Sequence, residues 1–222
     1  MTGLRRKIPF RAVITAGIFL LFSSSAAAQH IGWYGGLSAG QGKMDLTTRD
    51  WDDGTLTNTK LDNEAIAYKV MAGYRFTSLL ALEGGYVHFG DSKFSGVESQ
   101  PTSTIWQPGP VSGEARTKGV TLQALLAWPF AKERFAMFAK GGLFFWNTTM
   151  ISRPTIAGGT LALGDELVVH DDGVSWIFGA GAEMRLYDNW RIRLEWEHSM
   201  VGFSGTVDRN VNFPSLGVTL DF

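Results

Sequence analysis

The chain has 222 residues, enough for one domain, and contains no cysteine, so disulfide bonds, thiolate metal ligands and a cysteine nucleophile are excluded. Charged residues make up only 18% of the chain, aromatic residues make up 13%, and glycine occurs 27 times. This composition is typical of a sheet protein with one face in lipid. The formal charge of −1 gives no electrostatic reason to expect a nucleic-acid partner.

The N-terminal segment has the pattern of a secretion signal. It begins with basic residues, continues with an apolar run over residues 12–22, and ends in small residues with an A-x-A cleavage site. Cleavage is predicted between Ala28 and Gln29. A transmembrane anchor is the alternative, but the apolar run is shorter than the roughly 20 residues that span a membrane. The predicted domains are therefore a signal peptide, 1–28, and one barrel domain, 29–222.

Eight later segments alternate with a period of two, which is the pattern of β-strands whose two faces differ. In chain order they are 31–41, 65–76, 80–89, 117–130, 135–146, 174–186, 190–198 and 213–222. In the clearest of them, Tyr68 and Tyr74 share one face, whereas Lys69 and Arg75 share the other. In segment 135–146 both faces carry bulky residues, so its facing stays open.

Short turns and long polar loops alternate between these segments. The turns lie at residues 77–78, 131–133 and 188–189, and the loops at residues 43–63, 91–115, 147–172 and 199–211. This alternation is typical of outer-membrane barrels, which have short periplasmic turns and longer extracellular loops. The predicted fold is therefore all-β: an eight-stranded antiparallel up-and-down transmembrane β-barrel with four extracellular loops. An even number of strands puts both termini on the periplasmic side.

Aromatic residues gather near the strand ends, as they do in the interfacial girdles of membrane proteins. The predicted girdle comprises Trp33, Tyr74, Trp128, Trp190 and Phe222. Small and polar residues occupy the opposite faces, as a narrow barrel interior requires. A secreted soluble barrel of the lipocalin type, with its apolar faces inward, is the alternative fold. The girdle tryptophans and the terminal Phe222 favour the membrane barrel.

The polar faces carry charges that a membrane barrel would enclose. The predicted interior cluster comprises Glu83, Lys140, Glu183, Arg193, Glu195, Lys69 and Arg185, with Arg75, Arg191 and Glu197 on the same faces. Buried charges persist when they are paired or hydrogen-bonded, and an eight-stranded interior is just wide enough for side chains to fill it. We therefore expect a salt-bridge plug, and a conducting pore is the alternative.

Several short motifs, in their order and spacing, resemble the transmembrane barrel of the outer-membrane protein A (OmpA) family. They are Trp33-Tyr34, Leu82-Glu83-Gly84-Gly85-Tyr86, Gly119-Val120-Thr121-Leu122 with Trp128-Pro129, Lys140-Gly141-Gly142, Gly181-Ala182-Glu183, Arg193-Leu194-Glu195-Trp196 and Ser215-Leu216-Gly217-Val218-Thr219. The resemblance implies an interior charged cluster at Glu83, Lys140, Glu183, Arg193 and Glu195. A family lysine on the fourth strand stands here as Leu125, so no gating switch that uses that lysine is implied. The chain is expected to lack the peptidoglycan-binding domain of longer relatives.

The leading functional hypothesis is an integral outer-membrane protein of a Gram-negative cell that supports the envelope and is not an enzyme. Expected partners are outer-membrane lipid or lipopolysaccharide and a host or surface ligand of the loops. The outer-membrane assembly machinery is expected to bind the C-terminal strand that ends in Phe222. No cofactor and no nucleic acid is expected.

An enzyme that acts on lipid A, of the deacylase kind, is an alternative suggested by His198 and Ser199. A catalytic pair must come within hydrogen-bond reach. Neighbouring strand residues point to opposite faces, so these two side chains should diverge. The deacylase resemblance is further weakened because Met200 follows the serine.

A narrow small-solute channel is another alternative, and the interior residues Met71, Gln123 and Phe138 give it weak support. His88 is expected at the lipid interface rather than in a catalytic role. His170, with the two aspartates that follow it, is expected at a solvated loop end, because three adjacent residues do not converge on a metal ion without further ligands.

Overall fold

The computed structural model describes residues 31–47, 56–98, 108–132, 134–154, 167–203 and 207–222. The predicted signal peptide lies outside the described residues. Among the residues that are described, no helix is long and apolar enough to cross a membrane.

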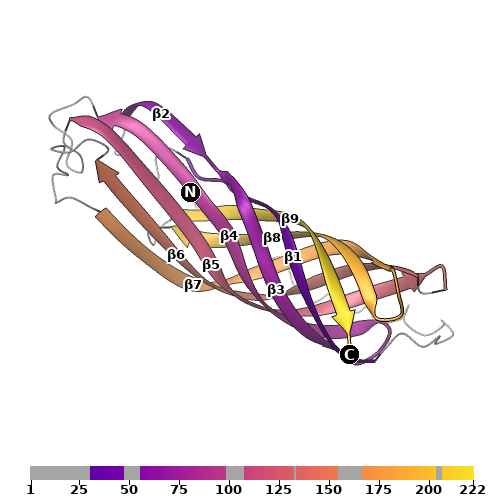
Figure 1. The fold of residues 1–222 in the computed structure, drawn as a ribbon. Coiled ribbons are helices and arrows are strands. Elements are labelled where there is room, and N and C mark those ends of the chain that lie inside the picture. Colours follow the sequence, from indigo (N-terminus) through magenta and orange to yellow (C-terminus); the bar gives the residue numbers. More distant parts are fainter. Residues whose placement is uncertain (1–30, 48–55, 99–107, 133, 155–166, 204–206) are drawn as a thin grey trace, which may run out of the picture.

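The described residues form nine antiparallel strands. They are β1 (Gly32–Met44), β2 (Leu56–Asp62), β3 (Glu64–Arg75), β4 (Leu80–Glu98), β5 (Gly109–Phe130), β6 (Phe135–Pro154), β7 (Leu167–Arg185), β8 (Trp190–Phe203) and β9 (Val207–Asp221). Eight of them close into a ring in which β1 pairs with β3 on one side and with β9 on the other, so the sheet meets itself (Figure 1). The prediction of an all-β, eight-stranded barrel is confirmed.

The two ends of the barrel differ. One end, called the turn end here, carries the C-terminus and the short connections 76–79 and 186–189, together with residues 131, 132 and 134 between β5 and β6. The outer parts of β2, β4, β5 and β6 extend to the other end, called the outer end (Figure 1). The predicted turns 77–78 and 188–189 are therefore in place, as are the described residues 131 and 132 of the third turn, and all lie at one end as the up-and-down topology requires.

The strands reach further into the outer end than the sequence pattern predicted. The pairing of β4 with β5 continues to Glu98 and Gly109, and that of β6 with β7 continues to Ser152 and Leu167. Apart from Pro108, every described residue of the predicted loops 91–115 and 147–172 lies in a strand, so the predicted loop boundaries are wrong there.

The predicted loop 43–63 also contains a strand. β2 precedes β3 in the chain and is separated from it by Asn63. Both strands pair with β4, β2 with its outer part, where Asp62 lies opposite Lys93. It adds a ninth strand at the outer end without changing the eight-stranded ring.

One reason for these errors is a change in the polarity of the two faces along β4. Near the turn end of β4, Leu82 is 43% exposed and points outward, whereas Glu83 is 1% exposed and points inward. Near the outer end of the same strand, Lys93 points outward and Phe94 inward. The outer wall therefore changes from apolar to polar, and polar sequence with glycine and proline was interpreted as loop.

Outward apolar side chains form a continuous band around the ring, called the apolar belt here. It includes Leu37, Ile66, Val70, Leu82, Tyr86, Val120, Leu122, Met137, Phe145, Val174, Trp176, Leu194, Leu216 and Val218. The direction of the β6 side chains, which the sequence left open, is now clear: Met137 and Phe145 point outward, whereas Phe138 and Phe144 are buried inside. This arrangement, apolar outside and polar inside, is the reverse of a soluble barrel.

Candidate functional site

The centre of the barrel holds a lattice of lysine and glutamate side chains. The Lys69 Nζ lies 2.6 Å from a carboxylate oxygen of Glu195 and 3.0 Å from one of Glu197. The Lys140 Nζ lies 2.7 Å and 2.9 Å from oxygens of the same two glutamates, and 3.2 Å from Glu83. Because β3 and β8 are not neighbours in the ring, these contacts cross the lumen. Both ammonium groups are fully buried.

Arg193 links this lattice to the turn end. Its guanidinium forms ion pairs with Glu83 and with Glu183, and its Nη1 lies 3.1 Å from the sulfur of Met71. The Arg193 guanidinium carbon also lies 5.0 Å from the centre of the Phe138 ring, a cation–π distance. The Arg193 guanidinium is therefore paired with two carboxylates and contacts Met71 and Phe138, and its side chain has no solvent exposure.

A third group of charges lies at the turn end. Arg75 approaches Glu183 at 3.2 Å and Asp221 at 3.5 Å, while Arg191 donates to Asp221 at 2.8 Å. Tyr34 connects this group to the lattice. Its hydroxyl donates to Glu83 at 3.1 Å, and the Arg75 guanidinium lies 4.5 Å from the centre of its ring.

Together these contacts form one network, called the charged plug here, with balanced charge. It contains five cations, Lys69, Arg75, Lys140, Arg191 and Arg193, and five carboxylates, Glu83, Glu183, Glu195, Glu197 and Asp221. Six of the seven predicted cluster residues lie in it. The seventh, Arg185, is half-buried at the turn end and lies opposite Arg191 in register.

The sequence analysis missed two members of the plug. Asp221 alternates with Leu220 and Phe222, and Tyr34 alternates with Trp33, so the period-two pattern places both side chains inside. Asp221 supplies the fifth carboxylate, which the predicted set of interior charges lacked.

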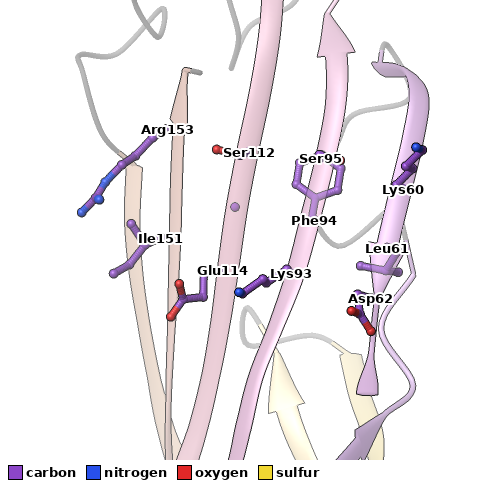
Figure 2. Close-up of a pocket in the computed structure, with 11 residues that line it drawn as sticks. Lys60, Leu61, Asp62, Lys93, Phe94, Ser95, Ser112, Glu114, Ile151 and Arg153 are labelled. Carbon is purple, nitrogen blue, oxygen red and sulfur yellow. The ribbon is translucent and has the colours of Figure 1, made fainter. Parts of the chain in front are cut away.

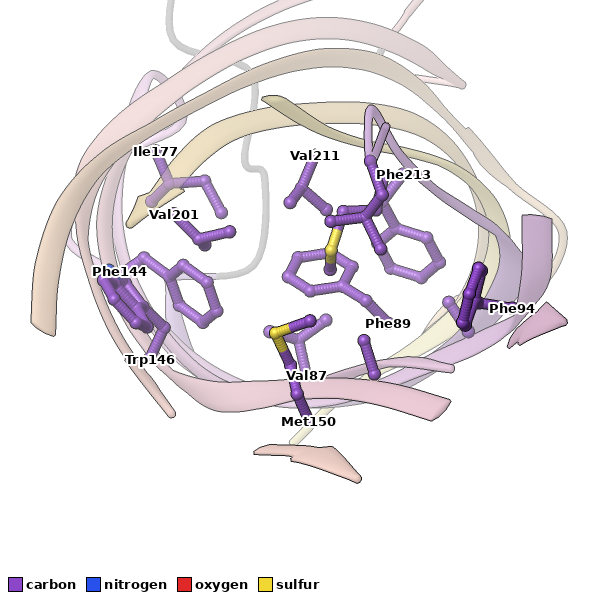
Figure 3. Close-up of a cluster of buried hydrophobic side chains, with 14 of the residues drawn as sticks. Val87, Phe89, Phe94, Phe144, Trp146, Met150, Ile177, Val201, Val211 and Phe213 are labelled. Carbon is purple, nitrogen blue, oxygen red and sulfur yellow. The ribbon is translucent and has the colours of Figure 1, made fainter. Parts of the chain in front are cut away.

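An apolar cluster fills the lumen between the charged plug and the outer end, and it is called the apolar core here (Figure 3). Every strand of the ring contributes to it. Its residues are Met44, Leu46, Ala67, Val87, Phe89, Phe94, Val111, Ala115, Phe144, Trp146, Met150, Ile177, Val201, Val211 and Phe213. The Phe89 ring lies edge-on to Phe144 at 5.5 Å and to Phe213 at 5.8 Å, so residues from three strands meet across the lumen.

Trp146 closes a split in the wall of the barrel. Pairing between β7 and β8 ends at Ile177 and Ser199, although both strands continue outward. The Trp146 ring lies close to Gly173 on β7 and to Gly202 on β8, and its Nε1 donates to Ser175 at 2.8 Å. Glycine at both positions leaves the space that the indole ring occupies.

The predicted aromatic girdle lies at the turn end. Trp33, Trp128, Trp190 and Phe222 are exposed on the outer surface, and Tyr74 is half-buried, with its ring centre 5.2 Å from that of Trp33. These five residues therefore mark one rim of the apolar belt.

The opposite rim carries two aromatic clusters that the sequence analysis did not identify as a girdle. The His88 ring stacks on Tyr68 at 5.2 Å, and the His198 ring lies 4.9 Å from Phe178 and 5.8 Å from Trp196. Alternation along the strands was the signal that could have identified them, because each histidine directly continues an outward apolar face.

The structure does not bring together the residues considered for catalysis. His198 faces outward, with its Nδ1 3.0 Å from the Asn212 side-chain oxygen, whereas Ser199 is buried and its Oγ donates to the Trp176 carbonyl at 3.0 Å. Within the described ranges, no group of three or more His, Cys, Asp or Glu residues has an arrangement that could hold a metal ion. His170 instead lies 3.1 Å from the Thr149 hydroxyl.

Sequence comparison finds relatives among outer-membrane proteins. Residues 28–222 match the family described as OmpA-like transmembrane domain. Outer membrane protein A of Serratia marcescens is 26% identical over 217 residues, an alignment that covers 95% of this chain and 54% of the relative, so this chain spans about half of that protein. The 31 kDa outer-membrane immunogenic protein of Brucella melitensis is 25% identical over 252 residues, covering 96% of this chain and 99% of the relative.

Solved structures share the fold. Neisserial surface protein A (NspA) has a TM-score of 0.53 at 13% identity, covering 86% of this chain and 97% of its own. OprG of Pseudomonas aeruginosa has a TM-score of 0.51 at 12% identity, covering 87% and 98%. Ail of Yersinia pestis has a TM-score of 0.50 at 16% identity, covering 87% and 100%. The chain therefore belongs to the family of OmpA-like transmembrane domains and is a β-barrel protein of the Gram-negative outer membrane.

Proposed function

We propose that the protein is a closed, non-conducting barrel that supports the integrity of the outer membrane and presents its outer end to the surroundings. The observation that carries this proposal is the double filling of the lumen, by the charged plug and by the apolar core. Ions passing through would have to break paired, fully buried charges and then cross a layer of aromatic and aliphatic side chains. Both steps are energetically unfavourable.

Conductance in planar lipid bilayers tests this proposal. We expect the purified, refolded protein to insert without producing sustained current steps, because no hydrated path crosses both layers. Successful insertion is checked on the same sample by the shift in gel mobility on heating, which a membrane barrel shows because its strand pairing persists in cold detergent. Long-lived open-channel steps from protein that shows this heat shift would contradict the proposal.

The orientation that follows is a turn end in the periplasm and an outer end outside the cell, as short turns and long outer strands suggest. The immunogenic character stated in the name of the Brucella relative supports exposure of the outer end. A surface ligand of the outer end is part of the proposal, whereas the divergence of His198 and Ser199 gives no support to catalysis at that pair.

Removal of Phe222 is expected to reduce the amount of folded barrel in the outer membrane several-fold. The Phe222 amide donates to the Trp33 carbonyl at 2.9 Å and so joins the last strand to the first, and its ring, 78% exposed, is available for the assembly machinery. Tyr187→Ala is the matched control, because Tyr187 is a 74% exposed aromatic residue at the same end. Quantitative immunoblots of heated and unheated outer-membrane fractions measure the effect. Equal loss in both variants would show that Phe222 has no special role in assembly.

A further inference from the structure

Strand β4 contains a β-bulge at the level where it changes partners. Between its pairs with β5 at His88 and at Asp91, β4 has two residues and β5 has one. Gly90 lies in this bulge with a left-handed backbone, at a φ of 83°. On the other side of β4, pairing with β3 ends at His88 and pairing with β2 begins at Lys93. The bulge therefore marks the point at which β4 passes from the ring into the outer end.

The bulge decides which side chains of the outer part of β4 point inward. On its turn-end side the inward residues have odd numbers, as at Phe89, whereas on its outer side they have even numbers, as at Phe94. One extra residue shifts a period of two by one position and so exchanges the two faces. Without the bulge, Lys93 would point into the apolar core. With it, Lys93 points outward next to Asp62 of β2 (Figure 2).

A histidine side chain holds the bulge in place. The Gly90 amide donates to the His88 Nδ1 at 3.0 Å, so this nitrogen carries no proton and the imidazole is neutral. The ring stacks on Tyr68 of β3, with ring centres 5.2 Å apart and planes 2° from parallel. Gly90 also packs tightly on β3, because an added Cβ would overlap Ala65 and the carbonyl oxygen of Ile66. The imidazole thus connects the bulge to the end of the β3 pairing.

The charged groups that face His88 do not replace this hydrogen bond when the ring is protonated. The Asp91 carboxylate lies 3.9 Å from Nε2, and both of its oxygens already accept from Arg116 of β5, at 2.7 Å and 3.1 Å. Lys118, opposite His88 on β5, adds a second positive charge. Stacking on Tyr68 does not require either protonation state. The surroundings of the bulge therefore suit the neutral imidazole.

We propose that His88 makes the outer end of the barrel sensitive to pH. Protonation puts a proton on Nδ1, so the ring no longer accepts from the Gly90 amide, and the bulge loses the hydrogen bond that fixes it. Histidine ordinarily gains this proton near pH 6.5. A conformation that needs the neutral ring is stable above this pH and loses stability as the pH falls through it. The outer part of β4 and its pairing with β2 then loosen in mildly acidic surroundings.

The signal is the pH outside the cell, and this part of the inference rests on the orientation given under the proposed function. The loosening itself follows from the bulge and does not depend on the orientation. The charged plug lies on the turn-end side of the bulge, where β4 keeps its pairing with β3 and β5. Acidic pH is therefore expected to change the outer end while the ring stays closed.

The test measures amide hydrogen exchange by NMR on the full mature chain in detergent micelles. Rates are compared at about pH 5 and about pH 7.5, on either side of the ordinary histidine pKa, after correction for intrinsic exchange. Reporter amides are those of residues 60–62, 90 and 93–95, and residues 191–195 of β8 serve as the internal reference.

Four forms are compared: wild type, His88→Asn, His88→Phe and His198→Asn. Asparagine keeps an acceptor that reaches the backbone two residues on, but it does not titrate. Phenylalanine keeps an aromatic ring for stacking but has no acceptor. His198→Asn is the matched control, because His198 belongs to the other aromatic cluster at the same rim and its Nδ1 faces the Asn212 side chain.

In wild type we expect the reporter amides to exchange about five-fold faster at the lower pH, as the loss of one hydrogen bond predicts. His198→Asn should behave like wild type, His88→Asn should exchange slowly at both pH values, and His88→Phe should exchange faster at both. Wild type without acceleration, His88→Asn with the acceleration of wild type, or His88→Phe with full protection would overturn the proposal. The heat shift and bilayer conductance are recorded for each form, so a heat-shifted, non-conducting barrel without this pH effect shows failure of the His88 proposal alone.

Discussion

Replacing Arg193 by methionine is expected to lower the free energy of unfolding by about 3–5 kcal/mol. Methionine occupies a similar length but removes the positive charge that lies between Glu83 and Glu183. Both carboxylates are buried, so each would lose a partner that solvent cannot replace. Equilibrium unfolding in urea, followed by tryptophan fluorescence in lipid vesicles, measures the change.

Lys43→Met is the matched control for Arg193→Met. Its side chain is 54% exposed, and its single ion pair with Glu64, at 3.4 Å, is also exposed. Exposed pairs contribute about 0–1 kcal/mol, so this variant should unfold near the wild-type midpoint. Similar small effects in both variants would show that the charged plug does not stabilise the barrel.

A double-mutant cycle tests the pair itself. Glu183→Gln removes one negative charge next to Arg193, and the combination with Arg193→Met should cost less than the sum of the two single changes. We expect a coupling energy of about 1–3 kcal/mol, as for residues in one buried network. Strict additivity would contradict a direct interaction between these two side chains.

The second large effect is expected for Gly142→Ala, which should destabilise the barrel by about 3 kcal/mol, at the upper end of the cost of overpacking. A Cβ atom at Gly142 would overlap the carbonyl oxygen of Leu122 and approach the Cα of Gln123 on the neighbouring strand. Both atoms belong to the backbone of β5, so relief requires the two strands to move apart.

Gly141→Ala provides a control at the adjacent position. Gly141 points outward, and the nearest atom to an added Cβ is the Ile177 carbonyl oxygen at 3.9 Å, an ordinary contact distance. We expect this variant to fold within about 0.5 kcal/mol of wild type. The stability of both variants is measured as the fraction of protein that shows the heat shift and as the midpoint of unfolding in urea. A normally stable Gly142→Ala barrel would show that β5 and β6 can separate at this level without cost.

The period-two alternation of apolar and polar residues was sufficient to predict the strands of the membrane-spanning half and the direction of most of their side chains. A strand residue and its next-but-one neighbour must share a face, so Lys69 and Arg75 were assigned to the interior and Tyr68 to the exterior from the chain alone. The same rule, with short turns between the strands, predicted the eight-stranded ring. It did not resolve β6, because Phe138 and Met137 are both bulky and apolar, and only the closed ring shows which side chain is buried.

The outer part of β4 could not be derived in this way, because the polarity of its two faces changes along the strand. An outward lysine and an inward phenylalanine, as at Lys93 and Phe94, reverse the polarity seen lower on the same strand. The change depends on where the surrounding lipid ends, and that level follows from the position of each strand in the barrel. This reversal places Phe94 in the apolar core.

The membership of the charged plug was partly contained in the sequence, whereas its pairing was not. Period-two alternation places charged side chains inside, and burial then requires them to be neutralised. Which cation meets which carboxylate depends on the curvature and register of strands that are distant in the chain. Lys69 and Glu195 are 126 positions apart, and they meet across the lumen only because β9 pairs with β1 to close the ring.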